Sequence, residues 1–236
     1  MKDKRKQKKK VNEVEINKLK EFGFIAYYVG IFFRFLSKLS PIGSRVKNQE
    51  EFDAAPDEEK INVCKKQAMR VDKYILGWIL FEIATLITSE LGIWKNYIGF
   101  ILILIIVLRI IDILQTNINL SIFDYERKAT RVASYVRVLV NVIVNYFELI
   151  LCFGFIYAQN LAFLINGSNY TDGYYFSATT QLTIGYGDII PSGFIKFIAC
   201  FQGFVGFLFA IIIISKLVSL FPKLEEIAKK NKGETK

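Results

Sequence analysis

Residues 174–188 read YYFSATTQLTIGYGD, and this stretch decides how the rest of the chain is interpreted. Its first nine residues are moderately apolar, and Thr171 or Asp172 just before them is a suitable helix N-cap. We therefore predict a short helix over 172–182. Such a helix cannot cross a bilayer core, which takes about 20 residues. The six residues that follow, 183–188, carry two glycines and are predicted to form an irregular loop.

The chain contains four apolar runs, and each is predicted to be a membrane-spanning helix. The stretch 174–188 lies between the third run and the fourth. They are residues 74–94, 98–115, 143–164 and 194–221. A half-helix between two spans indicates a re-entrant segment, because irregular backbone at membrane depth is tolerated only where it lines a water-filled path. The predicted fold is an all-α membrane protein with four spans and one re-entrant half-helix.

The composition agrees with a membrane protein. Of the 236 residues, 53% are apolar and 15% aromatic, more than is usual for a soluble domain of this size. The chain has no His, the commonest general base and metal ligand, and its three Cys suit neither a disulfide framework nor a zinc site. No nucleophile–base pair, metal cluster or phosphate-binding loop is recognisable, so we expect neither an enzyme nor a bound cofactor.

Basic residues predict the orientation in the membrane. Residues 1–73 carry 18 Lys and Arg, the 116–137 connection carries four, and the tail from Lys216 carries six. The other side has Lys95 and, at its margin, Lys196. Because positive residues concentrate in cytoplasmic segments, both termini are predicted to be cytoplasmic, in a multi-pass protein of the cell (plasma) membrane.

The loop 183–188 has the composition needed to replace the water shell of a potassium ion. Backbone carbonyls of Thr183, Ile184, Gly185 and Tyr186 can coordinate K⁺, with the Thr183 hydroxyl at the inner end. For all carbonyls to face one axis, neighbouring residues must alternate between left- and right-handed dihedral angles. Glycine adopts positive φ at little steric cost, so Gly185 and Gly187 are predicted to have it. The negative C-terminal end of the half-helix would favour a cation in front of it.

Residues 183–188 resemble the signature filter of tetrameric potassium channels. The resemblance covers residues 143–221 and implies an outer helix, a pore helix (172–182), a filter (183–188) and an inner helix (194–221). The resemblance also implies a homotetramer with fourfold symmetry, because each chain carries one such loop. The resemblance implies K⁺ as the permeant ion, with the filter residues as its ligands. The residues that match the family pattern are Thr180, Thr183, Tyr186, Asp188 and Pro191.

The sequence departs from that family around the filter. Leu182 stands where Thr is usual, and Thr179 and Tyr175 stand where an acidic residue and a Trp often brace the filter. We predict that Asp188, Tyr175, Thr179 and Thr180 support the filter. Selectivity is expected to survive these changes, whereas filter stability is expected to differ.

Two glycines in the fourth run suggest a gate. The family bends its inner helix at a glycine, and Gly206 is the predicted hinge, with Gly203 one turn before it. The alternative for Gly206 is a small residue that permits close helix packing. Further along, Ile211 to Ile214 could form a hydrophobic constriction that closes by dewetting.

Two charged residues within the first two runs are predicted to pair. Glu82 lies about 13 residues before the 95–97 turn and Arg109 about 13 after it, so antiparallel helices would bring them to similar depth. An unpaired charge at that depth is costly, which predicts a Glu82–Arg109 pair. Glu148 in the third run is another candidate partner.

The remaining segments complete the predicted organisation. Residues 22–39 are interpreted as an interfacial amphipathic helix, with a fifth span as the alternative. The Lys-rich start, from Lys2 to Lys10, would contact anionic lipid or remain solvated; no nucleic-acid partner is expected. The predicted parts are a cytoplasmic N-terminal region (1–73), an accessory two-helix hairpin (74–115), a basic linker (116–142), the pore domain (143–221) and a cytoplasmic tail (222–236).

Two other functions stay open at this point. One is a cation channel that discriminates weakly between potassium and sodium, for which Leu182 leaves room. The other is a regulatory membrane subunit that keeps a pore-like fold without conducting. Ion flux through the purified protein would separate both from a selective channel.

Overall fold

The computed structural model describes residues 60–89, 97–118 and 135–220, with a few single residues before Lys60. The predicted tail (222–236), most of the linker (116–142) and the Lys-rich start lie outside the described residues. Of the predicted interfacial segment 22–39, only Phe24, Tyr27, Tyr28 and Ile31 are described, and these four are helical. The chain divides into two compact units: residues 1–49 with 111–128, and residues 50–110 with 129–236.

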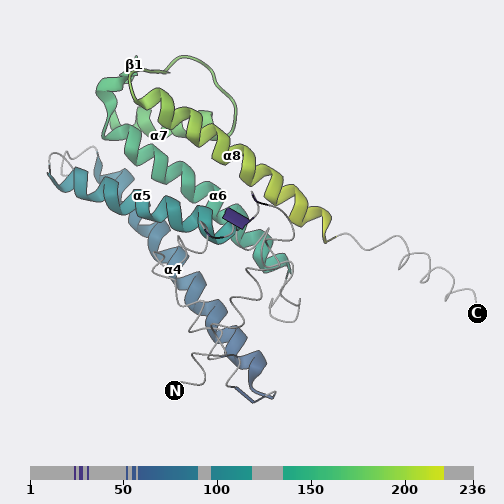
Figure 1. The fold of residues 1–236 in the computed structure, drawn as a ribbon. Coiled ribbons are helices and arrows are strands. Elements are labelled where there is room, and N and C mark those ends of the chain that lie inside the picture. Colours follow the sequence, from purple (N-terminus) through teal and green to yellow (C-terminus); the bar gives the residue numbers. More distant parts are fainter. Residues whose placement is uncertain are drawn as a thin grey trace, which may run out of the picture. The chain divides into compact units, whose positions relative to one another are not determined.

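Almost all of the described chain is helical (Figure 1). The elements are α4 (Lys60–Ser89), α5 (Tyr97–Ile118), α6 (Tyr135–Ala158), the 3₁₀ turn η4 (Leu161–Phe163), β1 (Leu164–Ile165), α7 (Tyr170–Gln181), β2 (Ile190–Pro191) and α8 (Ile195–Val218).

Three helices of the described chain are long and apolar enough to cross a membrane. They are α5 over its full length, α6 from Val136 and α8 over its full length, with mean hydropathies of 2.7, 2.0 and 2.6. Of the predicted span 74–94, residues 74–89 form the second half of α4, which begins at Lys60, and residues 90–94 lie outside the described residues. Length and composition thus confirm the predicted spans 98–115, 143–164 and 194–221. The span 74–94 stays a prediction.

Both ends of α6 differ from those predicted. The predicted third run covered 143–164, whereas α6 begins eight residues earlier, at Tyr135, and ends at Ala158. Beyond it the side-chain amide of Asn160 donates to the main-chain oxygen of Ile156, at 2.7 Å, which satisfies a carbonyl at the helix end. The apolar residues 161–165 belong to η4 and β1 instead. Hydropathy alone overran this end, because it does not register backbone hydrogen bonds.

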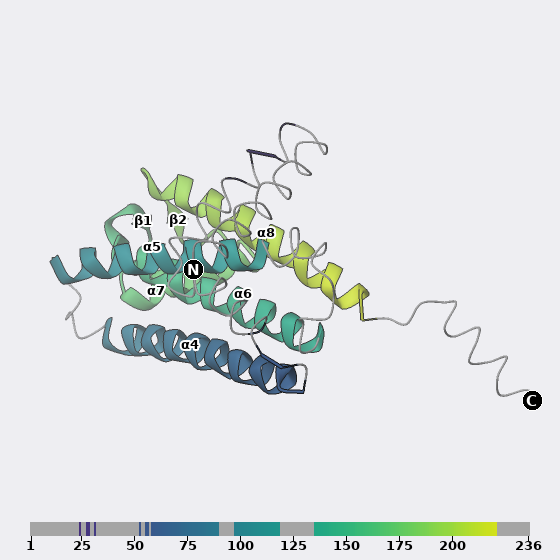
Figure 2. The same ribbon diagram turned by 60° about the horizontal axis from the view of Figure 1, so that its bottom comes forward.

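Within the second unit, α6 is the central helix, with α4 on one side and α8 on the other (Figure 2). Its buried side chains include Leu149, Phe153 and Tyr157, and Phe209 of α8 is fully buried as well. The short helix α7 packs closely on α6. A Cβ at Gly173 of α7 would collide with the backbone of Ala158, so only glycine permits this approach.

A two-residue ladder joins the segments before and after α7 and its following loop. Strands β1 and β2 are antiparallel, with Leu164 opposite Pro191 and Ile165 opposite Ile190. Next to the ladder, the main-chain oxygen of Phe163 accepts hydrogen bonds from the N–H and hydroxyl of Ser192, at 2.7 and 2.9 Å. The sequence had not predicted these strands. They fix both ends of the segment that contains the GYG sequence.

Candidate functional site

The start of α7 is stabilised by a carboxylate. Its N-cap is Asn169, not Thr171 or Asp172 as predicted, and Asp172 is the third helical residue. The Asp172 carboxylate accepts hydrogen bonds from the backbone N–H groups of Ser168 and Asn169, at 2.7 and 2.9 Å. These two bonds lower the pKa of Asp172 below its ordinary value of 3.8, and the bond from Asn169 has the larger effect.

The substitution Asp172→Asn is expected to destabilise the protein at neutral pH by about 0.3–1 kcal/mol, because the amide replaces a charged acceptor in the first turn of a helix and solvent screens this exposed charge. Since the folded pKa is lowered, this contribution is complete well above pH 3.8 and is lost as the pH falls through the folded value. Thermal unfolding of both proteins at pH 7 and pH 3 measures it. The difference should shrink at pH 3; an equal difference at both values would contradict the assignment to the charged carboxylate.

The loop after α7 alternates in backbone handedness. Thr183, Gly185 and Gly187 have positive φ of 56°, 58° and 77°, whereas Ile184 and Tyr186 between them do not. The positive φ at both glycines agrees with the prediction. The positive φ at Thr183 was not predicted, and it is unusual because a β-branched residue rarely adopts this conformation. Such a strained backbone conformation persists only where surrounding contacts stabilise it, and strained conformations of this kind are common at functional sites.

The last turn of α7 holds the beginning of this loop. The main-chain oxygen of Thr179 accepts from the N–H groups of Ile184 and Gly185, at 2.9 and 3.3 Å, and that of Thr180 accepts from Thr183 at 3.2 Å. The Thr179 hydroxyl donates to the main-chain oxygen of Phe176. Thr179 and Thr180 thus contact the loop through their main-chain oxygens, which the sequence pattern could not specify, and their support of a filter stays a prediction.

Asp188 is held from two sides at the end of the loop. The Tyr175 hydroxyl donates to its carboxylate at 2.7 Å, and the side-chain amide of Asn166 donates to its main-chain oxygen at 2.9 Å. The hydrogen bond to Asp188 is the main cause that raises the pKa of Tyr175 above 10.0. Tyr175 thus contacts the end of the loop, and its role as a brace of a filter stays a prediction.

The loop and one face of α8 are uncovered in the single chain. Tyr186 is 71% exposed, and no atom of the described residues lies within 4 Å of a Cβ built on Gly185 or Gly187. Along α8, exposed apolar side chains recur every three or four residues, which places them on one face of the helix. This face consists of Phe197, Phe201, Phe204, Phe207, Ile211, Ile214 and Val218.

The predicted gate residues lie on two different faces of α8, which is continuous through both glycines. Gly206 is buried, and a Cβ there would lie 3.0 Å from the main-chain oxygen of Gln181. Gly203 has open space around it, and Ile211 and Ile214 lie on the exposed apolar face. The contact with Gln181 favours the packing interpretation of Gly206. A hinge there stays a prediction.

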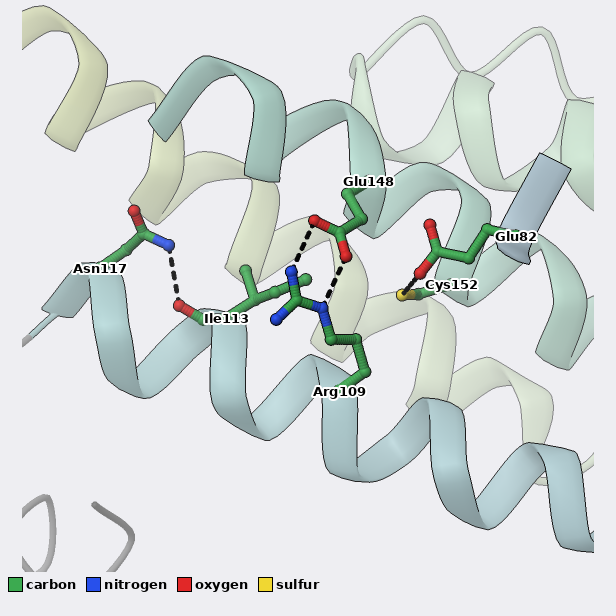
Figure 3. A network of polar contacts seen from close by, with 6 residues as sticks. All are labelled: Glu82, Arg109, Ile113, Asn117, Glu148 and Cys152. Carbon is green, nitrogen blue, oxygen red and sulfur yellow. Dashed lines mark hydrogen bonds and ion pairs between the residues drawn. The ribbon is translucent and has the colours of Figure 1, made fainter. Parts of the chain in front are cut away.

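The buried charges pair differently from the main prediction (Figure 3). Arg109 of α5 donates twice to Glu148 of α6, with Nε 2.6 Å from Oε1 and Nη2 2.9 Å from Oε2. Its guanidinium also lies over the rings of Tyr74 and Trp78 of α4, at 4.8 and 5.5 Å. Arg109 and Glu148 are almost fully buried, so this bidentate pair joins two apolar helices.

The predicted Glu82–Arg109 pair is therefore replaced by the alternative partner. Glu82 is 1% exposed and accepts a hydrogen bond from the Cys152 thiol of α6, with its Oε1 3.0 Å from Sγ. The number of residues from the 95–97 turn predicted the depth of each charged side chain in the membrane. It did not predict which neighbouring helix each side chain faces. Because α6 contributes an acidic residue at the same place, Arg109 pairs there.

Comparison with protein families assigns part of the chain to an ion channel model. Residues 145–223 match a family model described as an ion channel, and they comprise most of α6, α7, the GYG loop and α8. No curated protein and no solved structure matched the chain. The part of the chain that carries the candidate site is thus similar to ion channel domains, and together with the three apolar helices this supports an ion channel of a membrane.

Proposed function

We propose that the chain is one subunit of a homotetrameric, potassium-selective channel whose ion path runs along residues 183–187. The observation that carries this proposal is the alternation of φ at Thr183, Gly185 and Gly187. When successive residues alternate in handedness, their carbonyls can be turned toward the same side of the chain. A row of carbonyls on one side can replace the hydration shell of a dehydrated cation.

The surroundings of the loop support the same function. The loop begins at the C-terminal end of α7, where the partial negative charge of a helix favours a cation. The bonds from Ile184 and Gly185 to Thr179 satisfy the loop's N–H groups on the α7 side, which leaves the carbonyls available. Thr183, Ile184, Gly185 and Tyr186 are the proposed K⁺ ligands.

One chain supplies only one carbonyl at each level, whereas a ring around an ion needs four. The exposed face of α8 and the uncovered loop support assembly, because apolar stripes of this length are normally covered by protein or lipid. In the proposed tetramer, fourfold symmetry brings the four loops around one axis. We propose the same topology as the sequence predicts, with both termini cytoplasmic and α4 as a fourth span.

Packing supports membrane depth for the second half of α4. Helix α4 contacts α6 and α7, and within its second half Glu82 accepts a hydrogen bond from Cys152 of the apolar helix α6. A helix that packs along a membrane-spanning neighbour over this length lies in the same layer.

A weakly selective cation channel is the second candidate, and Leu182 is the observation that favours it. In potassium channels that the sequence resembles, Thr is usual at this position, and here an apolar, 42% exposed side chain precedes the loop. A missing hydroxyl there would alter the inner end of the ion path.

The reversal potential of the purified protein in a planar bilayer, with K⁺ on one side and Na⁺ on the other, tests the proposal. We expect a value near the potassium equilibrium potential. A value near zero with robust current would favour the weakly selective channel. Absence of current from the natural chain would contradict a conducting function. Chemical cross-linking of the same sample is expected to end at four subunits.

A further inference from the structure

Four buried polar side chains connect α6, α7 and α8 behind the loop. They are Tyr157 of α6, Ser177 and Gln181 of α7, and Gln202 of α8, and each is at most 1% exposed. Burying polar groups among apolar helices is costly unless they are hydrogen-bonded. The sequence did not predict a role for these four residues. The feature that could have indicated one is Gln202, a polar residue inside the apolar fourth run.

Gln202 is the centre of this group. Its amide nitrogen lies 3.0 Å from the main-chain oxygen of Ser177, 2.8 Å from the Ser177 hydroxyl and 3.1 Å from the side-chain oxygen of Gln181. Its own side-chain oxygen accepts from the Tyr157 hydroxyl at 2.8 Å. Both ends of the amide are therefore satisfied, and one side chain joins three helices.

Gln181, the last residue of α7, is fixed a second time by Tyr146 of α6. Its side-chain amide donates to the main-chain oxygen of Tyr146 at 3.2 Å, and the Tyr146 hydroxyl donates to the main-chain oxygen of Gln181 at 3.0 Å. Gly206 of α8 closes the remaining side, since any Cβ there would approach Gln181. The end of α7 is thus held from both neighbouring helices.

The position of this end determines the position of the loop. Thr179, in the same last turn, accepts from the N–H groups of Ile184 and Gly185. A shift of the turn would therefore move the residues that have alternating φ.

We propose that Gln202 is a positioning residue for the loop 183–187, and that it acts through Ser177 and Gln181 on the last turn of α7. The effect on ion selection rests on the proposed function, whereas the positioning of the backbone does not.

The variant Gln202→Met tests this, because methionine has similar length and volume but makes no comparable hydrogen bonds. It leaves Ser177, Gln181 and the Tyr157 hydroxyl without their shared partner. In the full-length purified protein, we expect hydrogen exchange at the amides of Ile184 and Gly185 to accelerate about tenfold or more. In planar bilayers, we expect the potassium-to-sodium permeability ratio to fall, with faster current decline at low external K⁺.

Gln159→Met is the matched control. Gln159 follows α6 directly, is half-buried, and its amide nitrogen has no hydrogen-bond partner among the described residues. The same chemical change there should leave loop exchange and permeability unaltered. Tyr157→Phe removes only the hydroxyl that donates to Gln202, so it remains informative where the methionine variant fails to assemble. We expect a smaller acceleration of exchange in the same direction.

The outcomes separate this proposal from the proposed function. Unchanged exchange at Ile184 and Gly185 in a folded Gln202→Met or Tyr157→Phe protein would overturn the positioning role, even in a selective channel. Accelerated exchange in the variants, combined with a reversal potential near zero for the natural chain, would uphold the positioning role and reject potassium selectivity. A variant that loses only thermal stability, with exchange and permeability ratio unchanged, would show a purely structural glutamine.

Discussion

Gly185→Ala is expected to abolish potassium selectivity. The φ of Gly185 is 58°, and a side chain in this left-handed conformation costs about 1–2 kcal/mol in each subunit. Relief of this strain requires φ to change sign, which would turn the adjoining carbonyls away from the proposed ion path. Because four subunits carry the change, we expect the permeability ratio of potassium to sodium to fall by more than about tenfold, equivalent to 1.4 kcal/mol. Reversal potentials in planar bilayers measure it.

The expected effect comes from the backbone conformation of Gly185 and not from a steric clash. A glycine with equal space but ordinary helical φ is therefore a matched control. In the part of the chain that the structure describes, nothing lies within 4 Å of a Cβ at Gly185, and the same is true of Gly77 in α4. Gly77 is helical and has no positive φ, so Gly77→Ala should be neutral or stabilising by about 0.5–1 kcal/mol. If Gly185→Ala conducted with unchanged selectivity, the handedness of the loop would not matter for ion selection.

Removal of one partner of the Arg109–Glu148 pair is expected to destabilise the protein strongly. Both side chains are at most 2% exposed, so Glu148→Leu leaves a buried guanidinium without its bidentate acceptor. We expect a loss of about 3–5 kcal/mol for this variant. The double variant Arg109→Met with Glu148→Leu removes both charges and should recover much of the loss. Thermal unfolding in detergent, with all four proteins of the cycle, measures the coupling.

An exposed pair in the same chain provides the control. Arg137 of α6 lies 2.6 Å from the carboxylate of Asp72 in α4, but their side chains are 29% and 52% exposed. Asp72→Asn should therefore cost about 0–1 kcal/mol. Equal effects at the buried and exposed pairs would contradict the importance of burial for the Arg109–Glu148 contact.

The helices were predictable because their signals are local. Runs of apolar residues predicted the positions of α5, α6 and α8, and the residue pattern before the loop predicted α7 to within two residues at either end. Glycine at 185 and 187 likewise predicted positive φ, since the steric cost of that conformation depends on the residue itself. The end of α6 was missed because the apolar run continues beyond Ala158 into η4 and β1.

What the sequence by itself determined is therefore the order of apolar helices, the half-helix and the two glycines of the loop. Tertiary structure alone decided that Arg109 pairs with Glu148, that Thr183 also has positive φ, and that Gln202 joins the end of α7 to its neighbours. The physical reason is the same in each case. Apolar length and backbone preference belong to a residue and its neighbours in the chain, whereas the partner of a buried polar group depends on which helix faces it.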